Sequence, residues 1–209
     1  MNSNKFKLFE LFLLFIIIPV VFSVDAIGLV TKLIAGVIGF LYVIWVLLKV
    51  EKNKFEISKN IKWKRFWVQT LIRLIVIIII TTCYVAVMAW DHLFIVLLNK
   101  PILWIAILFI YSLFSVYPQE LIFRTFFFQR YEALIKNKTL FIYLNAVLFS
   151  LAHLFFKNSL VILLTFIGGL LFAHTYYKTK STLLVSLEHA IYGCWLFTIG
   201  MGAMLGFPT

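Results

Sequence analysis

The chain has 209 residues, of which 64% are hydrophobic and only 13% are charged. Soluble domains average about 45–50% apolar and about 25% charged residues, so this composition excludes an ordinary soluble protein and indicates a membrane protein. The formal net charge is +11. The basic residues fall mainly in short loops between apolar runs, where they orient helices and meet lipid headgroups, so nucleic acid is not an expected partner.

The first half of the chain predicts three membrane helices. Its apolar runs cover residues 8–24, 27–48 and 66–90, and each has about the 17–25 residues that a helix needs to cross a bilayer. The loop at residues 49–65 is strongly basic, with Lys52, Lys54, Lys59, Lys62 and Lys64. Because lysine and arginine accumulate in cytoplasmic loops, we expect this loop and the N-terminus to be cytoplasmic.

The second half predicts further membrane segments. An apolar segment at residues 93–117 is interrupted near Pro101, and a helix at about residues 119–135 follows Pro118, a residue that is well tolerated at a helix start. The last runs cover residues 140–156, 160–177 and 183–205. We therefore expect an all-α, polytopic transmembrane helical bundle with seven to eight membrane segments. No repeat or linker appears, so residues 1–209 are predicted to form a single integral membrane domain.

Two observations bear on the region around Pro118. Residues 101–135 would form a helix much longer than one crossing, since each residue adds about 1.5 Å and the hydrocarbon is about 30 Å thick. A single crossing would nevertheless place the lysines that follow it in the cytoplasm, as the positive-inside rule prefers. A kinked or partly re-entrant segment around Pro118 would satisfy both observations.

Four ionisable residues lie deep within the apolar runs: Glu120, Arg124, His153 and His189. Such a residue at the bilayer centre costs about 2.5 kcal/mol or more, so it usually faces the protein interior or a wet cavity. Glu120 and Arg124 are four residues apart and share one face of a helix, where they can pair. Taken singly, a pair that only locks helices explains Arg124 equally well, and each histidine is more often a core residue.

The combination of an acid with two histidines on three helices favours a functional site. These side chains could hold a water molecule against a carbonyl group. Glu120, His153 and His189 could also bind a divalent metal such as zinc, because catalytic zinc needs three protein ligands and one open position. The sequence alone leaves both possibilities open.

The order of these motifs resembles the CAAX prenyl protease and bacteriocin-processing family, also called the Abi family. The motifs are E-x-x-x-R at Glu120 and Arg124, F-x-x-x-H at Phe149 and His153, and a late membrane histidine at His189. The likeness covers roughly residues 100–206, the expected catalytic core. Members are intramembrane endopeptidases. The resemblance implies that a glutamate and a histidine activate water, while a second histidine and an asparagine bind the oxyanion.

Two positions depart from the family pattern. Gln119 stands where the first of two paired glutamates is usual, and Gly193 stands where asparagine or aspartate is usual. Three interpretations follow. Glu120 has taken over as the base, or Glu188 supplies the carboxylate with Asn145 or Gln119 as oxyanion donor. Alternatively, the protein is a bacteriocin-immunity or partner-binding relative with little proteolytic activity.

We favour the first interpretation, an intramembrane endopeptidase of a bacterial cytoplasmic membrane. Glu120 would deprotonate water with help from His153, His189 would stabilise the oxyanion, and Arg124 would orient Glu120. The expected partners are the lipid bilayer and a peptide or protein substrate. A small transporter is a weaker alternative, because transporters typically carry paired broken helices and this chain shows one break, near Pro118.

Overall fold

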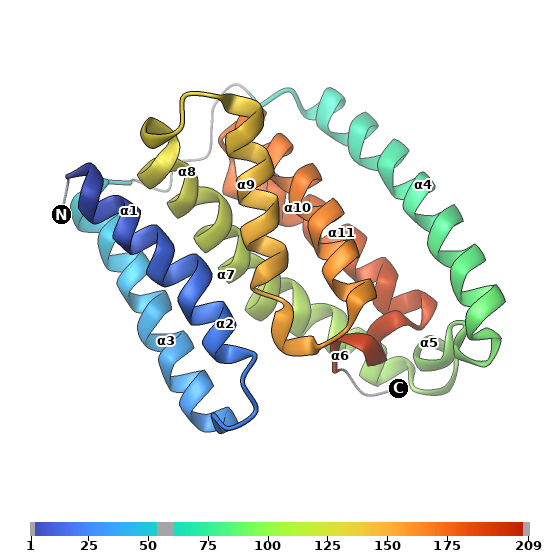
Figure 1. The fold of residues 1–209 in the computed structure, drawn as a ribbon. Helices are drawn as coiled ribbons and strands as arrows, with labels where there is room; N and C mark the ends of the chain where they lie inside the picture. Colours follow the sequence, from blue (N-terminus) through green and yellow to red (C-terminus); the bar gives the residue numbers. More distant parts are fainter. Residues whose placement is uncertain (1–2, 54–60, 207–209) are drawn as a thin grey trace. The chain divides into compact units, whose positions relative to one another are not determined.

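The computed structural model describes residues 3–53 and 61–206, and these residues are predominantly helical (Figure 1). None of the described residues forms a β-strand. The predicted all-α fold is therefore confirmed. The middle of the basic loop, with Lys54 and Lys59, lies outside the described residues.

Six helices in the described ranges are long and apolar enough to cross a membrane, and the chain is an integral membrane protein. They are Leu29–Val50, Trp63–Met88, Pro101–Leu134, Lys138–Phe156, Ser159–Thr179 and Thr182–Ile199. The number is below the predicted seven to eight for two reasons. The N-terminal helix carries Lys5, Lys7 and Glu10 and is not among the six. The two segments expected on either side of Pro118 form one helix.

The helix Pro101–Leu134 continues through Pro118 instead of breaking there. It consists of α6 (Pro101–Ile110), α7 (Tyr117–Glu120) and α8 (Phe127–Tyr131), joined by the π-helical stretches η4 (Tyr111–Val116) and η5 (Leu121–Phe126) and closed by the 3₁₀ turn η6 (Glu132–Leu134). Proline has no N–H to donate, and the widened turns on both sides carry the helix past it. Stretches of π-helix are rare and often occur at functional sites.

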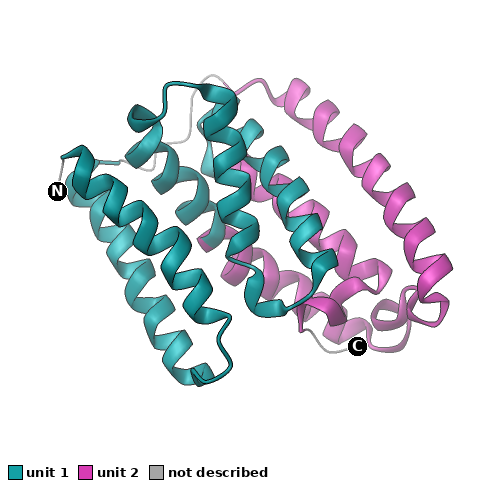
Figure 2. Ribbon diagram, in the orientation of Figure 1, with its two compact units in different colours: residues 1–57, 119–182 teal, residues 58–118, 183–209 magenta. Residues whose placement is uncertain are grey.

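The described helices group into two compact units (Figure 2). Unit 1 contains Met1–Ile57 and Gln119–Thr182, and unit 2 contains Ser58–Pro118 and Leu183–Thr209. Each unit is therefore built from two separate stretches of chain, which alternate along the sequence. The boundary between Pro118 and Gln119 falls within the long helix.

In unit 1, an N-terminal hairpin accompanies the helix pair α9 and α10 (Figure 1). The hairpin consists of α1 (Asn4–Phe12), η1 (Leu13–Ile17), α2 (Ile18–Phe22), α3 (Leu29–Trp45) and η2 (Val46–Val50). Helix α9 (Lys138–Leu151) is followed by the turn η7 (Leu154–Phe156) and by α10 (Ser159–Thr179). Asparagine caps both helix starts, since Asn137 accepts from the N–H of Leu140 and Asn158 from that of Leu160.

Helices α9 and α10 approach each other closely at Gly169. A Cβ atom at this glycine would lie 3.0 Å from Cα and 3.2 Å from the carbonyl oxygen of Ala146 on α9. Backbone atoms cannot yield easily, so any larger residue at position 169 would push the helices apart. Small residues at such contacts are characteristic of helix packing in membranes, because they allow extensive van der Waals contact.

A buried ionic cluster joins the two stretches of unit 1. Nε of Arg130 on α8 donates to Glu10 on α1 at 2.7 Å, and its Nη1 donates to Glu51 at 2.8 Å. The hydroxyls of Tyr131 and Tyr42 also donate to Glu10. The side chains of Arg130 and Glu10 are 0% and 3% exposed. This cluster ties α1, α3 and the residues after η2 to α8.

Unit 2 is organised around α11 (Thr182–Ile199). It also contains α4 (Trp63–Met88), η3 (Trp90–His92), α5 (Ile95–Asn99), α6, η4 and the final turn η8 (Met201–Leu205). Val96, Ile107, Tyr111, Val116 and Phe197 form its apolar core. Tryptophan N–H groups link α11 to its neighbours: Trp195 donates to Thr81 on α4 at 2.9 Å, and Trp104 on α6 donates to Thr198 at 3.0 Å.

Replacing Arg130 should destabilise unit 1 strongly. Arg130→Met leaves Glu10 and Glu51 without their cation, and removing one partner from a buried ion pair costs about 3–5 kcal/mol. We expect a clear fall in the thermal unfolding midpoint of the purified protein in detergent. The matched control is Arg65→Met, since Arg65 on α4 is exposed and makes no ion pair with a described residue. Equal midpoints for the two variants would contradict the structural role of the cluster.

Candidate active site

The first motif forms a buried ion pair in unit 1. Glu120 ends α7 and Arg124 lies in η5, and both side chains are fully buried. Nε of Arg124 lies 3.4 Å from Oε2 of Glu120. The pairing expected from the spacing of four residues is confirmed. A guanidinium beside a carboxylate fixes the orientation of that carboxylate.

The second motif contacts the first through an aromatic ring. The guanidinium carbon of Arg124 lies 4.7 Å from the ring centroid of Phe149 on α9 and 5.8 Å from that of Phe172 on α10. A guanidinium over an aromatic face is attracted by the negative face of the ring. Two rings and one carboxylate therefore fix the position of Arg124.

His153 completes this chain of contacts at the end of α9. Its ring lies edge-to-face with that of Phe149, with 4.8 Å between centroids, and its Nδ1 is 2.8 Å from the carbonyl oxygen of Phe149. A neutral histidine that donates from Nδ1 leaves Nε2 as a hydrogen-bond acceptor. The contacts run from Glu120 through Arg124 and Phe149 to His153, all within unit 1.

Asn145 supports the site from one turn before Phe149. Its Nδ2 donates to the carbonyl oxygen of Phe123 in η5 at 2.7 Å, and its side chain is fully buried. This bond satisfies a backbone group of the π-helical stretch that carries Arg124. The interpretation that made Asn145 an oxyanion donor thus concerns a side chain already engaged with the backbone through one of its amide hydrogens.

In unit 2, His189 lies on α11 and is 7% exposed. Its ring is edge-to-face with that of Tyr111 in η4, with 6.1 Å between centroids and an interplanar angle of 80°. The site residues of the sequence prediction are thus divided between the units: Glu120, Arg124 and His153 lie in unit 1, and His189 lies in unit 2.

Glu188, the alternative source of a carboxylate, is held by α4. Its Oε1 accepts from Nη1 of Arg73 at 2.5 Å and from the hydroxyl of Tyr192 at 2.9 Å. The same hydroxyl lies 3.2 Å from the carbonyl oxygen of Thr70. Oε2 of Glu188 is buried without a hydrogen-bond partner among the described residues. The ion pair with Arg73 gives Glu188 a structural role in joining α4 to α11.

A divalent metal on Glu120, His153 and His189 would require these side chains to form one ligand group. Among residues 3–53 and 61–206, no group of three or more His, Cys, Asp or Glu side chains is arranged to hold a metal ion. The chemistry proposed below uses protein side chains alone.

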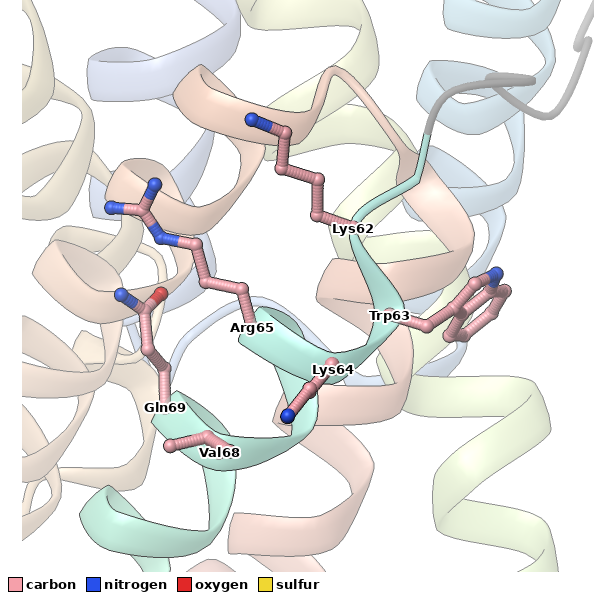
Figure 3. Close-up of a pocket in the computed structure, with 6 residues that line it drawn as sticks. All are labelled: Lys62, Trp63, Lys64, Arg65, Val68 and Gln69. Atoms are coloured by element: carbon pink, nitrogen blue, oxygen red, sulfur yellow. The ribbon is translucent and has the colours of Figure 1, made fainter.

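A surface hollow of about 590 Å³ lies at the start of α4 (Figure 3). Six residues line it: Lys62, Trp63, Lys64, Arg65, Val68 and Gln69. Arg65 and Gln69 extend to one side of the helix and Trp63 to the other (Figure 3). None of the predicted site residues lines this hollow. Its three basic residues and tryptophan are typical of a membrane–water interface.

Comparison with known proteins supports the family resemblance. Residues 98–195 match the family model for type II CAAX prenyl endopeptidase Rce1-like proteins. This segment is similar to that family. It makes up slightly under half of the chain and includes all four predicted site residues. No curated protein and no solved structure matches the chain. The chain is therefore a membrane protein with a segment that resembles CAAX endopeptidases.

Some residues around the CAAX endopeptidase-like motifs were not identified as site residues from sequence. Arg73 lies within an apolar run, and that signal could have marked it as the partner of a buried acid. Tyr111 carries no such signal, because a tyrosine in an apolar helix is ordinary. Its proximity to His189 depends on contacts between η4 and α11, which are far apart in the sequence.

The coupling between Glu120 and Arg124 can be measured with a double-mutant cycle. Arg124→Met leaves a buried carboxylate, so we expect a loss of about 3–5 kcal/mol in the free energy of unfolding. Adding Glu120→Gln should recover part of this loss, with a coupling energy of about 1–3 kcal/mol. Unfolding in detergent with increasing denaturant provides the measurement.

The control cycle uses Lys180→Met and Glu132→Gln. These side chains form an ion pair in unit 1 at 2.7 Å but are 48% and 45% exposed, so their coupling should stay below about 1 kcal/mol. Equal coupling in the two cycles would show that the Glu120–Arg124 pair is no stronger than a surface pair.

Proposed function

We propose that the protein is an intramembrane endopeptidase that hydrolyses a peptide bond of a membrane-associated or small peptide substrate. The observation that carries this proposal is the buried Glu120–Arg124 pair, which is connected through Phe149 to His153. All four residues lie in the segment that matches the CAAX endopeptidase family. A buried ion pair is by itself weak evidence for stability, and the contact of Arg124 with Phe149 joins this pair to the second motif.

The proposed reaction begins with a water molecule bound by Glu120 and His153. The Glu120 carboxylate accepts a proton, and the water oxygen attacks the carbonyl carbon of the peptide bond. Negative charge then develops on the carbonyl oxygen, where His189 donates a hydrogen bond. When the C–N bond breaks, the proton held by Glu120 passes to the leaving nitrogen. The products are a carboxylic acid and an amine, and Glu120 returns to its starting form.

Arg124 has a positioning role in this proposal. Its charge is permanent, so it is a poor proton donor but a suitable partner for a carboxylate. Held between Glu120 and the rings of Phe149 and Phe172, it keeps the base in place while the proton moves. Burial strengthens each of these electrostatic interactions, since water is excluded.

Gln119 cannot serve as the base, because a neutral amide does not accept a proton under ordinary conditions. This departure, together with Gly193, supports a second candidate function. The protein would then be a bacteriocin-immunity or partner-binding membrane protein with little proteolytic activity. In that case Glu120→Ala and His153→Ala should leave the cellular phenotype intact at matched expression.

We also propose a bacterial cytoplasmic membrane location with the N-terminus in the cytoplasm. The exposed Lys62, Lys64 and Arg65 at the start of α4 support this orientation, because basic residues near helix ends are retained on the cytoplasmic side. Headgroups of anionic lipids in that leaflet would also attract them.

Replacing the proposed base should abolish cleavage. We expect Glu120→Gln to reduce kcat by at least about 100-fold, because the amide cannot take the proton from water. The assay follows a quenched fluorescent peptide with a prenylated CAAX terminus, and the same peptide without the prenyl group, in detergent and in vesicles. Glu132→Gln, which changes an exposed glutamate in the same way, serves as the control. Unchanged cleavage by Glu120→Gln would refute the mechanism.

Chelation tests the side-chain mechanism separately. The proposed mechanism uses side chains alone, so cleavage should persist after incubation with EDTA or 1,10-phenanthroline. The rate before and after incubation is compared, followed by addition of zinc. A loss of activity that zinc restores would instead support a metal held by Glu120, His153 and His189.

A further inference from the structure

In unit 2, the phenol of Tyr111 lies directly against Gly193. A Cβ atom at Gly193 on α11 would collide with the hydroxyl oxygen, Cζ and Cε1 of Tyr111 in η4. These atoms would approach more closely than real Cβ contacts allow. The tip of the phenol therefore fills the volume that a side chain at position 193 would need, and any larger residue there would displace Tyr111.

The phenol is also firmly placed beside His189. The Tyr111 ring packs edge-to-face against His189 at 6.1 Å and against Phe197 at 4.7 Å between centroids. Tyr111 is 8% exposed and belongs to the apolar core of unit 2. Gly193 follows His189 by four residues, about one helical turn. The Tyr111 hydroxyl thus lies one turn from His189, at the position where the third motif lacks a polar side chain.

We propose that Tyr111 supplies, from a different helix, the hydrogen-bond donor that Gly193 cannot provide to the oxyanion. This inference rests on the proposed endopeptidase function. A phenol is a neutral donor, as an asparagine amide is, and it can donate to a developing negative charge without losing its proton. No other change to the reaction is needed: the proton still moves from water to Glu120 and then to the leaving nitrogen.

An oxyanion donor could come from a side chain at position 193 or from the phenol of Tyr111, but the two require the same volume. A side chain at position 193 and the phenol at position 111 cannot both occupy this volume. The absence of a donor at Gly193 and the presence of Tyr111 are then two parts of one arrangement. A purely structural phenol would fill the space equally well but would contribute nothing to the rate.

Removal of the hydroxyl oxygen separates these roles. Tyr111→Phe keeps the ring in the core, so the thermal unfolding midpoint should change little. We expect kcat for the prenylated CAAX peptide to fall about 100- to 1,000-fold, the usual effect of losing one oxyanion donor. KM should stay nearly constant, because the bond forms only in the transition state. The control is Tyr143→Phe, since Tyr143 is 52% exposed on α9.

A reciprocal exchange provides the second test. Gly193→Asn alone should be poorly active because it collides with Tyr111, and Tyr111→Ala alone should be poorly active because it lacks the donor. The double variant Tyr111→Ala/Gly193→Asn has both space and an amide, so we expect kcat to return to within about 10-fold of the wild type. Such non-additivity is expected only for residues that share one site.

The outcomes distinguish this inference from the proposed function. If the wild type cleaves the peptide and Tyr111→Phe cleaves it equally fast, the role of Tyr111 is overturned and the endopeptidase proposal stands. A double variant no more active than the two single variants would also overturn it. If the wild type cleaves neither peptide, while inserting and folding normally, the endopeptidase proposal and the role of Tyr111 fall together.

Discussion

Unit 1 depends on the ionic cluster around Arg130. One guanidinium neutralises Glu10 from the first helix and Glu51 from the residues after η2, and these groups are largely removed from solvent. An unpaired charge there would cost several kcal/mol, so the N-terminal hairpin has one favourable position against α8. Because α8 continues from η5, the same constraint holds the stretch that carries Arg124. The geometry of Glu120 therefore rests on an ion pair in which it takes no part.

The two arginines of this helix have different surroundings and different consequences. Arg130 has two carboxylates beside it, and one of them, Glu10, also accepts from Tyr131, a combination suited to fixing helices. Arg124 has one carboxylate and two aromatic faces. Aromatic rings attract the face of the guanidinium and do not compete for hydrogen bonds from its N–H groups. Arg124 can therefore orient Glu120 while part of the carboxylate remains for other contacts. This difference supports a structural role for Arg130 and a positioning role for Arg124.

Most helices could be predicted from the sequence, because the lengths of apolar runs and the asparagine caps are local signals. The Glu120–Arg124 pair was also predictable, since four residues bring two side chains to one helix face. The sequence left open how the chain passes Pro118, as a kinked or a partly re-entrant segment, because flanking π-turns have no clear sequence signature. Glu10 and Arg130 carry the same signal as Glu120, a charge within an apolar run, but their partners are separated by 120 residues. Tyr111 could not be identified from the sequence, because its proposed role depends on contact with a glycine on another helix.

The alternation of the two units along the chain has a consequence for biosynthesis. Glu10 and its partner Arg130 are 120 residues apart, and Arg73 and Glu188 are 115 apart. At about 5–20 residues per second, roughly 6–24 seconds separate the synthesis of Glu10 from that of Arg130. During this interval the first helices must reside at the translocon or in the lipid with an uncompensated acid. Neither unit can form before the second half of the chain arrives, so a truncated product would expose unpaired charges that membrane quality control can recognise.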